Sequence, residues 1–418
     1  MTLFFKECKK VIFSMTFLIY TVVTFAMYFT QYDSDRSPLQ KPSPGQESYG
    51  MTAKEVPEIL MPAAARGLMS EYISGSYTAY PVGFYKSVRL SEKKKERMAE
   101  IILEITGLTG DALENYSNEL DDSVNYIVDS NGNLTMVQQR IDTPEINIPE
   151  NMTYEHFRDL MREADTLIGG GSKYSDQYII GNFSLVPKTY EDALAEYEDV
   201  FYKEKISPAY ARLFCDYMCI DLAVLPVFAA AALTDKDKRS QMCELINSRR
   251  ISSAKLVITR YLALVTVMLI PVAIAVIHAA VGVEQMYPGY ETDPLAFAKY
   301  SAIWLIPNIL LAAAVGMLLT EAISPLIAVF AQAAWWFSDI FASAGALTGS
   351  IGSFTLVPRH NSLYGSQVFQ STLRQFTFNR VFYTLLSIVL TVIIAMVYEI
   401  KRRGGLNGFF AAAKDHKV

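Results

Sequence analysis

The chain has 418 residues, of which 51% are hydrophobic and only 19% are charged, whereas soluble domains carry about 25% charged residues. Long uncharged apolar runs of this kind exclude a disordered chain, a collagen and a coiled coil. The net charge of −6 weighs against a nucleic-acid-binding protein, and four cysteines are too few for a disulfide framework.

The apolar residues gather in uncharged runs, and a helix needs about 20 apolar residues to cross a bilayer. The first run, 11–32, is too long for the apolar part of a signal peptide, so we expect a retained membrane anchor. Four later runs lie at 261–283, 300–320, 322–338 and 381–398. A shorter run, 222–234, reaches spanning length if it is extended back through Asp221 and Asp216 to about Leu213. The sequence therefore predicts a mainly α membrane protein with six transmembrane helices.

Basic residues in the short loops predict the orientation of these helices, because Lys and Arg favour the cytoplasmic side. Fifteen of them precede the first span, lie between the second and third spans, or follow the sixth. The short loops on the opposite side hold only Lys299, Arg359, Arg374 and Arg380. We therefore expect a multi-pass protein of the cell membrane with both termini in the cytoplasm and residues 33–208 outside.

The predicted outer segment, 33–208, has 17 basic and 30 acidic residues. It has no cysteine, and an outer domain without disulfides favours a Gram-positive plasma membrane. Residues expected to cap helices within it are Ser91, Thr153 and Thr189. Asp192 takes the place of the usual Glu in a capping box with Thr189. Strands are predicted on both sides of the DSNGN turn at 129–133. This segment is therefore expected to be a mixed, mostly helical domain.

The sequence has no motif typical of catalysis. It has no Gly-x-x-x-x-Gly-Lys-Ser/Thr phosphate loop and no His-Glu-x-x-His, so we expect no catalytic residues, no metal and no cofactor in this chain. Polar residues inside spans are costly and usually face protein or water. Three are candidates for a polar layer on a translocation path: Asp221, His278 and Asp339. The alternative is solvation at the interface, with Arg212 pairing with Asp216 one helical turn away. Cys215 and Cys219 are also one turn apart, and we expect both to be core thiols.

The loop between the second and third predicted spans, 235–260, is short and basic. Ser240 is expected to cap a short helix in it, ending at Ser248. Met242, Leu245 and Ile246 follow helical spacing and form one apolar stripe. Such a stripe has too few neighbours to form a core, so it must rest on the membrane surface or on a partner.

This loop continues as CELINSRRISSAKLVITRYLA from residue 243, and the N-terminus reads LFFKECKK at 3–10. With these segments and six predicted spans, the chain resembles the ABC type-2 permease family, the membrane subunits of ABC exporters. Glu244, Leu245 and Ile251-Ser252 match the Glu, the Leu-rich turn and part of the Pro-Ile-Ser-Arg stretch of the family's loop. Lys255 and Arg260 also occupy matching places. Two features depart from the pattern: the Gly-Thr pair before the Glu is absent, and Arg250 replaces the Pro.

The resemblance implies a permease that forms the path with a second permease, as a homodimer or heterodimer, and that is driven by a separate ABC ATPase. Membrane lipid is the other expected partner, and no nucleic acid is expected. The implied ATPase-coupling residues are Met242, Glu244, Leu245, Ile246, Arg249 and Arg250. The implied segments are an elbow (1–10), span 1 (11–32), an extracellular domain (33–208), span 2 (212–234), a coupling loop (235–260), span 3 (261–283), span 4 (300–320), span 5 (322–346), an extracellular segment (347–380), span 6 (381–398) and a cytoplasmic tail (399–418).

Two other functions fit the sequence. A secondary transporter would use Asp221 and Asp339 to couple transport to protons or sodium, although such proteins usually contain repeated sets of spans and none is evident here. A membrane-anchored adaptor would bind a ligand through 33–208, although six spans are more than an anchor needs. The family implies export of a peptide antibiotic, a lipid or an ion, and the sequence does not select among them.

Overall fold

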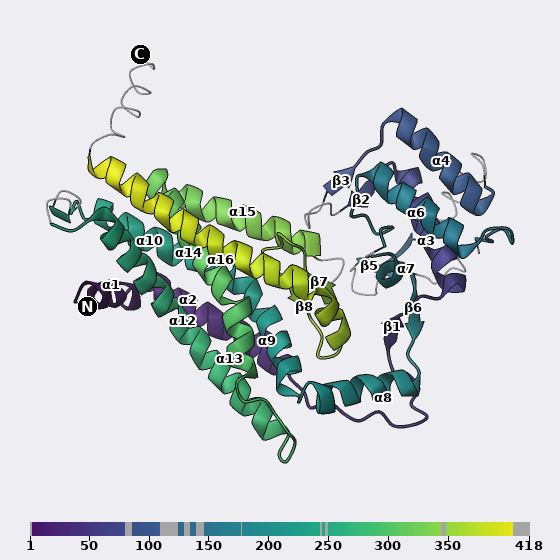
Figure 1. The fold of residues 1–418 in the computed structure, drawn as a ribbon, viewed down its shortest axis with the longest axis horizontal. Coiled ribbons are helices and arrows are strands. Elements are labelled where there is room, and N and C mark those ends of the chain that lie inside the picture. The colour runs from purple at the N-terminus through teal and green to yellow at the C-terminus, as the bar shows by residue number, and fades with distance from the viewer. Residues whose placement is uncertain are drawn as a thin grey trace. The chain divides into compact units, whose positions relative to one another are not determined.

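A computed structural model describes residues 2–79, 86–108, 124–128, 134–138, 146–176, 178–242, 245–246, 250–343 and 348–403. The chain forms two compact units, one made of residues 1–42 with 194–418 and the other of residues 43–193. The first unit is a bundle of apolar helices, and the second is a smaller mixed domain. Figure 1 shows the elements of both units with their labels.

The helical bundle is built from eleven helical segments and one small hairpin in its described part. They are α1 (Thr2–Ile12), α2 (Met15–Met27), η1 (Tyr28–Asp33), η2 (Asp199–Lys203), α9 (Ser207–Leu222), α10 (Pro226–Arg239), α12 (Ser253–Met286), α13 (Ala296–Trp304), α14 (Ile306–Ala322), α15 (Pro325–Ser343), β7 (Thr348–Ser350), β8 (Arg359–His360) and α16 (Ser366–Arg402). Both η segments are short π-helical turns that continue a neighbouring helix.

Four helices of the described chain are long and apolar enough to cross a membrane: 207–237, 253–286, 296–322 and 366–402. A fifth is added if α1 and α2, which meet at a bend of 65°, count as one broken span. α15 is apolar but shorter than these helices. The chain is therefore a multi-pass, mainly α membrane protein, as predicted from its uncharged runs.

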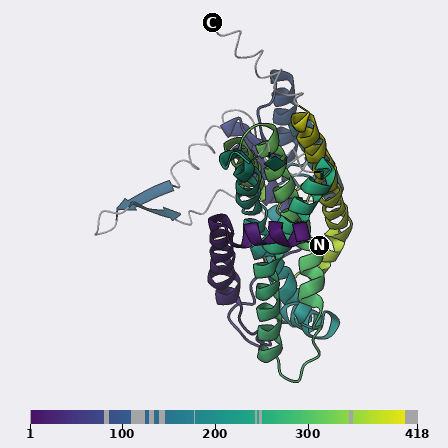
Figure 2. The ribbon, with the colours of Figure 1, turned by 90° about the vertical axis from the view of Figure 1, so that its left-hand side faces the viewer.

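The bend between α1 and α2 lies two to three residues beyond the predicted boundary of the elbow. Ser14 causes it, because its hydroxyl accepts a hydrogen bond from the N–H of Phe17 and so starts a new helix. α1 is amphipathic and packs along α12, with the thiol of Cys8 at 4.0 Å from the carbonyl of Ala263. In Figure 2, α1 runs across the end of the bundle that carries the N-terminus.

The sixth predicted span begins much earlier than its uncharged run. α16 starts at Ser366, whereas the sequence predicted a span over 381–398 and a connecting segment over 347–380. Fourteen residues therefore separate the start of this helix from Arg380, which is buried. Within the predicted connecting segment, the described residues before α16 form β7, β8 and irregular turns, and many of them are buried.

The smaller unit contains α3 (Pro57–Ser74), α4 (Glu92–Thr106), α6 (Tyr154–Ile168), α7 (Ile179–Phe183) and the first part of α8 (Tyr190–Glu198). Its strands form three antiparallel pairs: β1 (Met51–Ala53) with β6 (Leu185–Pro187), β2 (Tyr77–Ala79) with β3 (Lys86–Val88), and β4 (Val124–Val128) with β5 (Leu134–Gln138). α3, α4 and α6 share one apolar core. The predicted mixed, mostly helical domain is confirmed in its described part.

The helix caps of this unit follow the sequence closely. Thr153 accepts from the N–H of His156 at the start of α6. Ser91 stands at the N-cap position of α4, but its side chain makes no capping hydrogen bond. At α8, Thr189 and Asp192 each accept a hydrogen bond from the other's backbone N–H, at 3.1 and 3.2 Å. Asp therefore completes the predicted capping box in place of Glu.

Candidate functional site

One end of the bundle, here called the basic end, joins α1, α10, α12 and α16. Arg260 near the start of α12 forms an ion pair with Asp237 of α10 and lies 3.7 Å from Glu7 of α1. At the same end, Arg402 of α16 donates to the carbonyl of Ile251 at 2.6 Å. The N-terminal helix, the loop after α10 and the end of α16 therefore lie together, as Figure 1 shows.

The loop after α10 begins differently from the prediction. Ser240 does not cap a new helix; its hydroxyl donates to the carbonyl of Lys236 at 2.8 Å, at the end of α10. α10 continues past its apolar run and is closed by Gln241, whose φ of 55° is left-handed. The N–H of Met242 then reaches back to the carbonyl of Asp237 at 3.0 Å, which is a Schellman closure.

Apolar side chains of this loop are exposed in the bundle. Met242 is 44% exposed and Leu245 is 51% exposed, while Ile246 is half-buried. The N–H of Ile246 donates to the carbonyl of Met242, so a helical turn forms there. Arg250 is exposed, and two other predicted coupling residues, Glu244 and Arg249, lie outside the described residues.

Far from the basic end, the segment between α15 and α16 is held by buried charges. Asp216 of α9 accepts from Nε and Nη2 of Arg359 at 2.9 and 3.0 Å, and from the N–H of His360 at 2.7 Å. Asp216 and His360 have no exposed surface, and Arg359 is 7% exposed. The predicted pairing of Arg212 with Asp216 is therefore wrong.

Arg212 has another partner because it points toward the beginning of α9. Its guanidinium forms a bidentate pair with Glu204, at 2.5 and 2.9 Å, and also donates to the carbonyl of Leu363. The ring of Phe369 lies 5.5 Å from the same guanidinium. The segment before α16 is thus fixed by both arginines.

Arg380 is the centre of a second buried network. Its guanidinium donates to the carbonyl of Trp304 at 3.0 Å, to Oδ1 of Asn308 at 2.8 Å and to Oδ1 of Asn379 at 2.9 Å. It also donates to the carbonyl of Thr355 at 3.2 Å. Neutral oxygens therefore surround this cation, which connects α14, α16 and the segment between α15 and α16. Sequence analysis placed Arg359 and Arg380 in short loops; their position beside apolar runs gave no sign of their partners.

The three predicted path residues are not hydrogen-bonded to one another in the described part of the chain. Asp339 of α15 accepts the backbone N–H groups of residues 356–357, at 3.0 and 2.8 Å. His278 of α12 lies 2.6 Å from the hydroxyl of Tyr28. Asp221 is 7% exposed, and neither of its carboxyl oxygens has a hydrogen-bond partner among the described residues.

A break after Asp221 interrupts the helix that α9 and α10 form together. Pro226 has no N–H, so it cannot satisfy the carbonyl one turn before it, and the chain turns at 223–225. Side chains of α15 compensate: Gln332 donates to the carbonyl of Ala223 and Trp336 to that of Ile220, both at 2.7 Å. Pro226 thus breaks its span, and the neighbouring helix supplies donors to two carbonyls at the break, those of Ile220 and Ala223.

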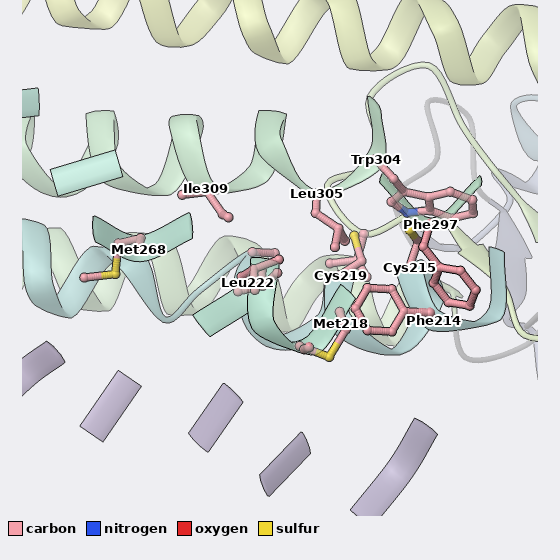
Figure 3. Close-up of a cluster of buried hydrophobic side chains, with 14 of the residues drawn as sticks. Phe214, Cys215, Met218, Cys219, Leu222, Met268, Phe297, Trp304, Leu305 and Ile309 are labelled. Atoms are coloured by element: carbon pink, nitrogen blue, oxygen red, sulfur yellow. The ribbon is translucent and has the colours of Figure 1, made fainter. Parts of the chain in front are cut away.

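Both thiols of α9 face the core, as predicted. Figure 3 shows Cys215 and Cys219 among apolar and aromatic side chains, with Trp304 and Leu305 opposite them. Both cysteines are fully buried, and Sγ of Cys219 accepts from Nδ2 of Asn308 at 2.9 Å. Among the described residues, no group of three or more His, Cys, Asp or Glu side chains is placed to hold a metal ion.

These features define a multi-pass α-helical membrane protein with a polar interior and a basic end that exposes an apolar loop. No protein-family model, no curated protein and no solved structure matches the chain. The functional assignment therefore rests on the residues and contacts described above.

Proposed function

We propose that this chain is the permease subunit of an ATP-driven ABC exporter, working with a second permease and a separate ATPase. The observation that carries the proposal is the exposed apolar loop at the basic end, where Met242 and Leu245 are exposed between α10 and α12. An exposed apolar turn on a charged surface is typical of a docking site. Its place in the chain, between the second and third predicted spans, is where the resembled family contacts its ATPase.

In this proposal, α15 also crosses the membrane, as the fifth of six spans in chain order. Its 19 residues reach roughly 28 Å at about 1.5 Å per residue, close to the thickness of a bilayer core. Six crossings place α1 and the end of α16 on the same side of the membrane, in agreement with their contacts through 251–260. The basic end is then cytoplasmic and residues 43–193 are extracellular, in a Gram-positive plasma membrane. The cargo is proposed as a peptide antibiotic, a lipid or an ion.

The docking step is tested by Leu245→Asp. Burying one Leu side chain contributes about 1.5–3 kcal/mol, and the substitution forfeits this and buries a charge, so ATPase affinity should fall by well over about tenfold. Affinity is measured by co-purification of the permease with a co-expressed ABC ATPase, together with ATP-driven export. The spans are unchanged, so the variant should insert normally.

Leu245→Met is the matched control, because it keeps an apolar side chain of similar volume. It should bind the ATPase nearly as the parent chain does. If Leu245→Asp binds the ATPase undiminished, the loop rests on the membrane surface instead and the docking assignment fails.

One observation favours a second function, transport coupled to protons or sodium. Asp221 is buried beside the break in the second helix and its carboxyl group has no partner among the described residues, whereas Asp339 is satisfied by two backbone N–H groups. Ionisable groups at broken helices are typical of coupling-ion sites in secondary transporters.

Asp221→Asn separates the two functions in proteoliposomes. An ion-coupled transporter should lose uptake driven by a proton or sodium gradient when Asp221 is neutral, with folding intact. An ATP-driven exporter should show no gradient-driven transport in either the parent chain or the variant. Gradient-driven transport in the parent chain that Asp221→Asn abolishes would replace the exporter proposal.

A further inference from the structure

A crevice of about 220 Å³ lies at the basic end, between the corner of α1 and α2 and one face of α10. Its lining has two parts. Lys10, Ser14, Thr16 and Lys236 are polar, and the remaining lining side chains are apolar, among them Met15 and Leu233. No acidic residue lines the crevice. The site is therefore suited to a ligand with an anionic head and an apolar body.

The lysines provide the positive charge. Lys10 forms an ion pair with Glu7 at 2.7 Å, which leaves further N–H donors on its ammonium group for a ligand. Lys236 is exposed, and it makes no ion pair within the described part of the chain. Ser14 and Thr16 stand at the first turn of α2, where backbone N–H groups lack intrahelical acceptors. An anionic headgroup would find donors from both sides of the crevice.

An apolar stripe leaves the crevice along α2. Met15, Ile19 and Val22 follow helical spacing and are 70%, 54% and 58% exposed. In a membrane-spanning helix this face contacts acyl chains. The order along α2, donors at the corner and then apolar side chains, matches the order of a phospholipid from its phosphate to its tails.

We propose that this crevice binds the headgroup of an anionic phospholipid, with the acyl chains along the exposed face of α2. The lysines contact the phosphate from α1 and α10, and the lipid thereby joins the bent N-terminal helix to the second span. This inference rests on the membrane placement of the bundle and is independent of an ATPase or a cargo.

The test uses the full-length protein in a neutral detergent, titrated with phosphatidylglycerol or phosphatidylcholine and analysed by native mass spectrometry. Phosphatidylglycerol should bind the parent chain more tightly than phosphatidylcholine does. Lys10→Gln with Lys236→Gln should weaken phosphatidylglycerol binding by about tenfold or more, because each removed lysine is one attraction to the phosphate. Size-exclusion profiles show whether each variant remains folded.

Two further variants keep the test specific. Lys9→Gln with Lys255→Gln removes the same charge from exposed positions near the basic end, outside the crevice, and should change affinity only a little. Ala232→Phe fills the crevice and keeps both lysines, and it should weaken binding as well.

Three results would overturn the proposal. If both pairs of lysine substitutions weaken phosphatidylglycerol binding equally, diffuse surface charge attracts the lipid and the crevice does not. If Ala232→Phe binds the lipid as the parent chain does, the lipid binds elsewhere. Displacement of phosphatidylglycerol by millimolar inorganic phosphate would assign the crevice to a free anion.

Discussion

Asp216 is a fully buried carboxylate whose charge is balanced by one arginine and one backbone N–H. Removing one partner of a buried ion pair leaves an uncompensated charge, which typically costs more than the pair contributes when intact. Arg359 would be that charge. It would remain buried within the segment between α15 and α16 without its counterion.

Asp216→Asn should therefore lower the free energy of unfolding by about 3–5 kcal/mol. The measurement is chemical unfolding of the purified protein in mixed micelles, followed by the intrinsic fluorescence of its three tryptophans. Asp216→Asn together with Arg359→Met should recover part of the loss, because no unpaired charge remains. A double variant as unstable as the sum of both single variants would contradict this account.

An exposed pair in the smaller unit is a control for the size of this effect. Arg97 and Glu163 form an ion pair at 2.7 Å, and both side chains are 39% exposed. Glu163→Gln should change stability by less than about 1 kcal/mol, because solvent screens the pair. The hydrogen bond from Arg97 lowers the pKa of Glu163, so its small contribution is present above the ordinary pKa and is lost as the pH falls through the lowered one.

Sequence reasoning identified most residues that act locally and missed those that act across the fold. Thr153 and the Thr189–Asp192 box were predictable because a cap contacts its own backbone three residues away. Asp216 and Arg359 are 143 residues apart, and nothing near either of them in the sequence indicates the other. Local spacing suggested Arg212 as the partner of Asp216, because spacing alone can propose only residues about one helical turn away.

At the scale of helices, α10 and α14 pack most closely at Gly316. A Cβ atom at this glycine would lie 2.7 Å from Cβ of Ala230 and 3.1 Å from the carbonyl oxygen of Val227. Membrane helices approach this closely only where a small residue faces the partner helix. Gly316 therefore sets the distance between the two helices.

Gly316→Ala should destabilise the bundle by about 1–3 kcal/mol, and Gly316→Leu by more, since backbone and side chains must shift. Thermal unfolding in detergent measures both. Gly181→Ala is the matched control, because Gly181 is helical and a Cβ there meets nothing within 4 Å. If Gly316→Ala is as well tolerated as Gly181→Ala, the helices have room to move apart.

Helices with clear start and stop signals in the sequence were predictable, and α3 was not. α4 and α6 follow a cap, an apolar period and a glycine stop, and their boundaries agree with the sequence. α3 carries Pro62 in its interior, and its apolar residues do not keep to one face, so neither signal was present. It forms because its buried side chains complete the core with α4 and α6.

For the whole molecule, the decisive property is which end of the bundle faces the cytoplasm. The positive-inside rule predicts that the basic end lies there and that residues 43–193 lie on the other side. In a chain whose native cysteines are replaced, Ser240→Cys should react with a membrane-impermeant thiol reagent only after the cells are opened. Glu47→Cys should react in intact cells.

The reverse pattern of labelling would mean that the topology is inverted. The loop after α10 would then be out of reach of a cytoplasmic ATPase. Labelling of both positions in intact cells would contradict six crossings. Lys9→Cys provides an internal check, because α1 and the loop lie at the same end of the bundle and should behave alike.

The repair of the broken second helix by α15 has a consequence for how the protein is made. Ala223 and its acceptor carbonyl are synthesised 109 residues before Gln332. A ribosome adding about 5–20 residues per second leaves this carbonyl without its partner for roughly 5–20 s. The second span therefore enters the membrane incomplete, and assembly of the bundle waits for its fifth helix. Insertion of α15 therefore supplies the donors that complete the second span, before α16 is made.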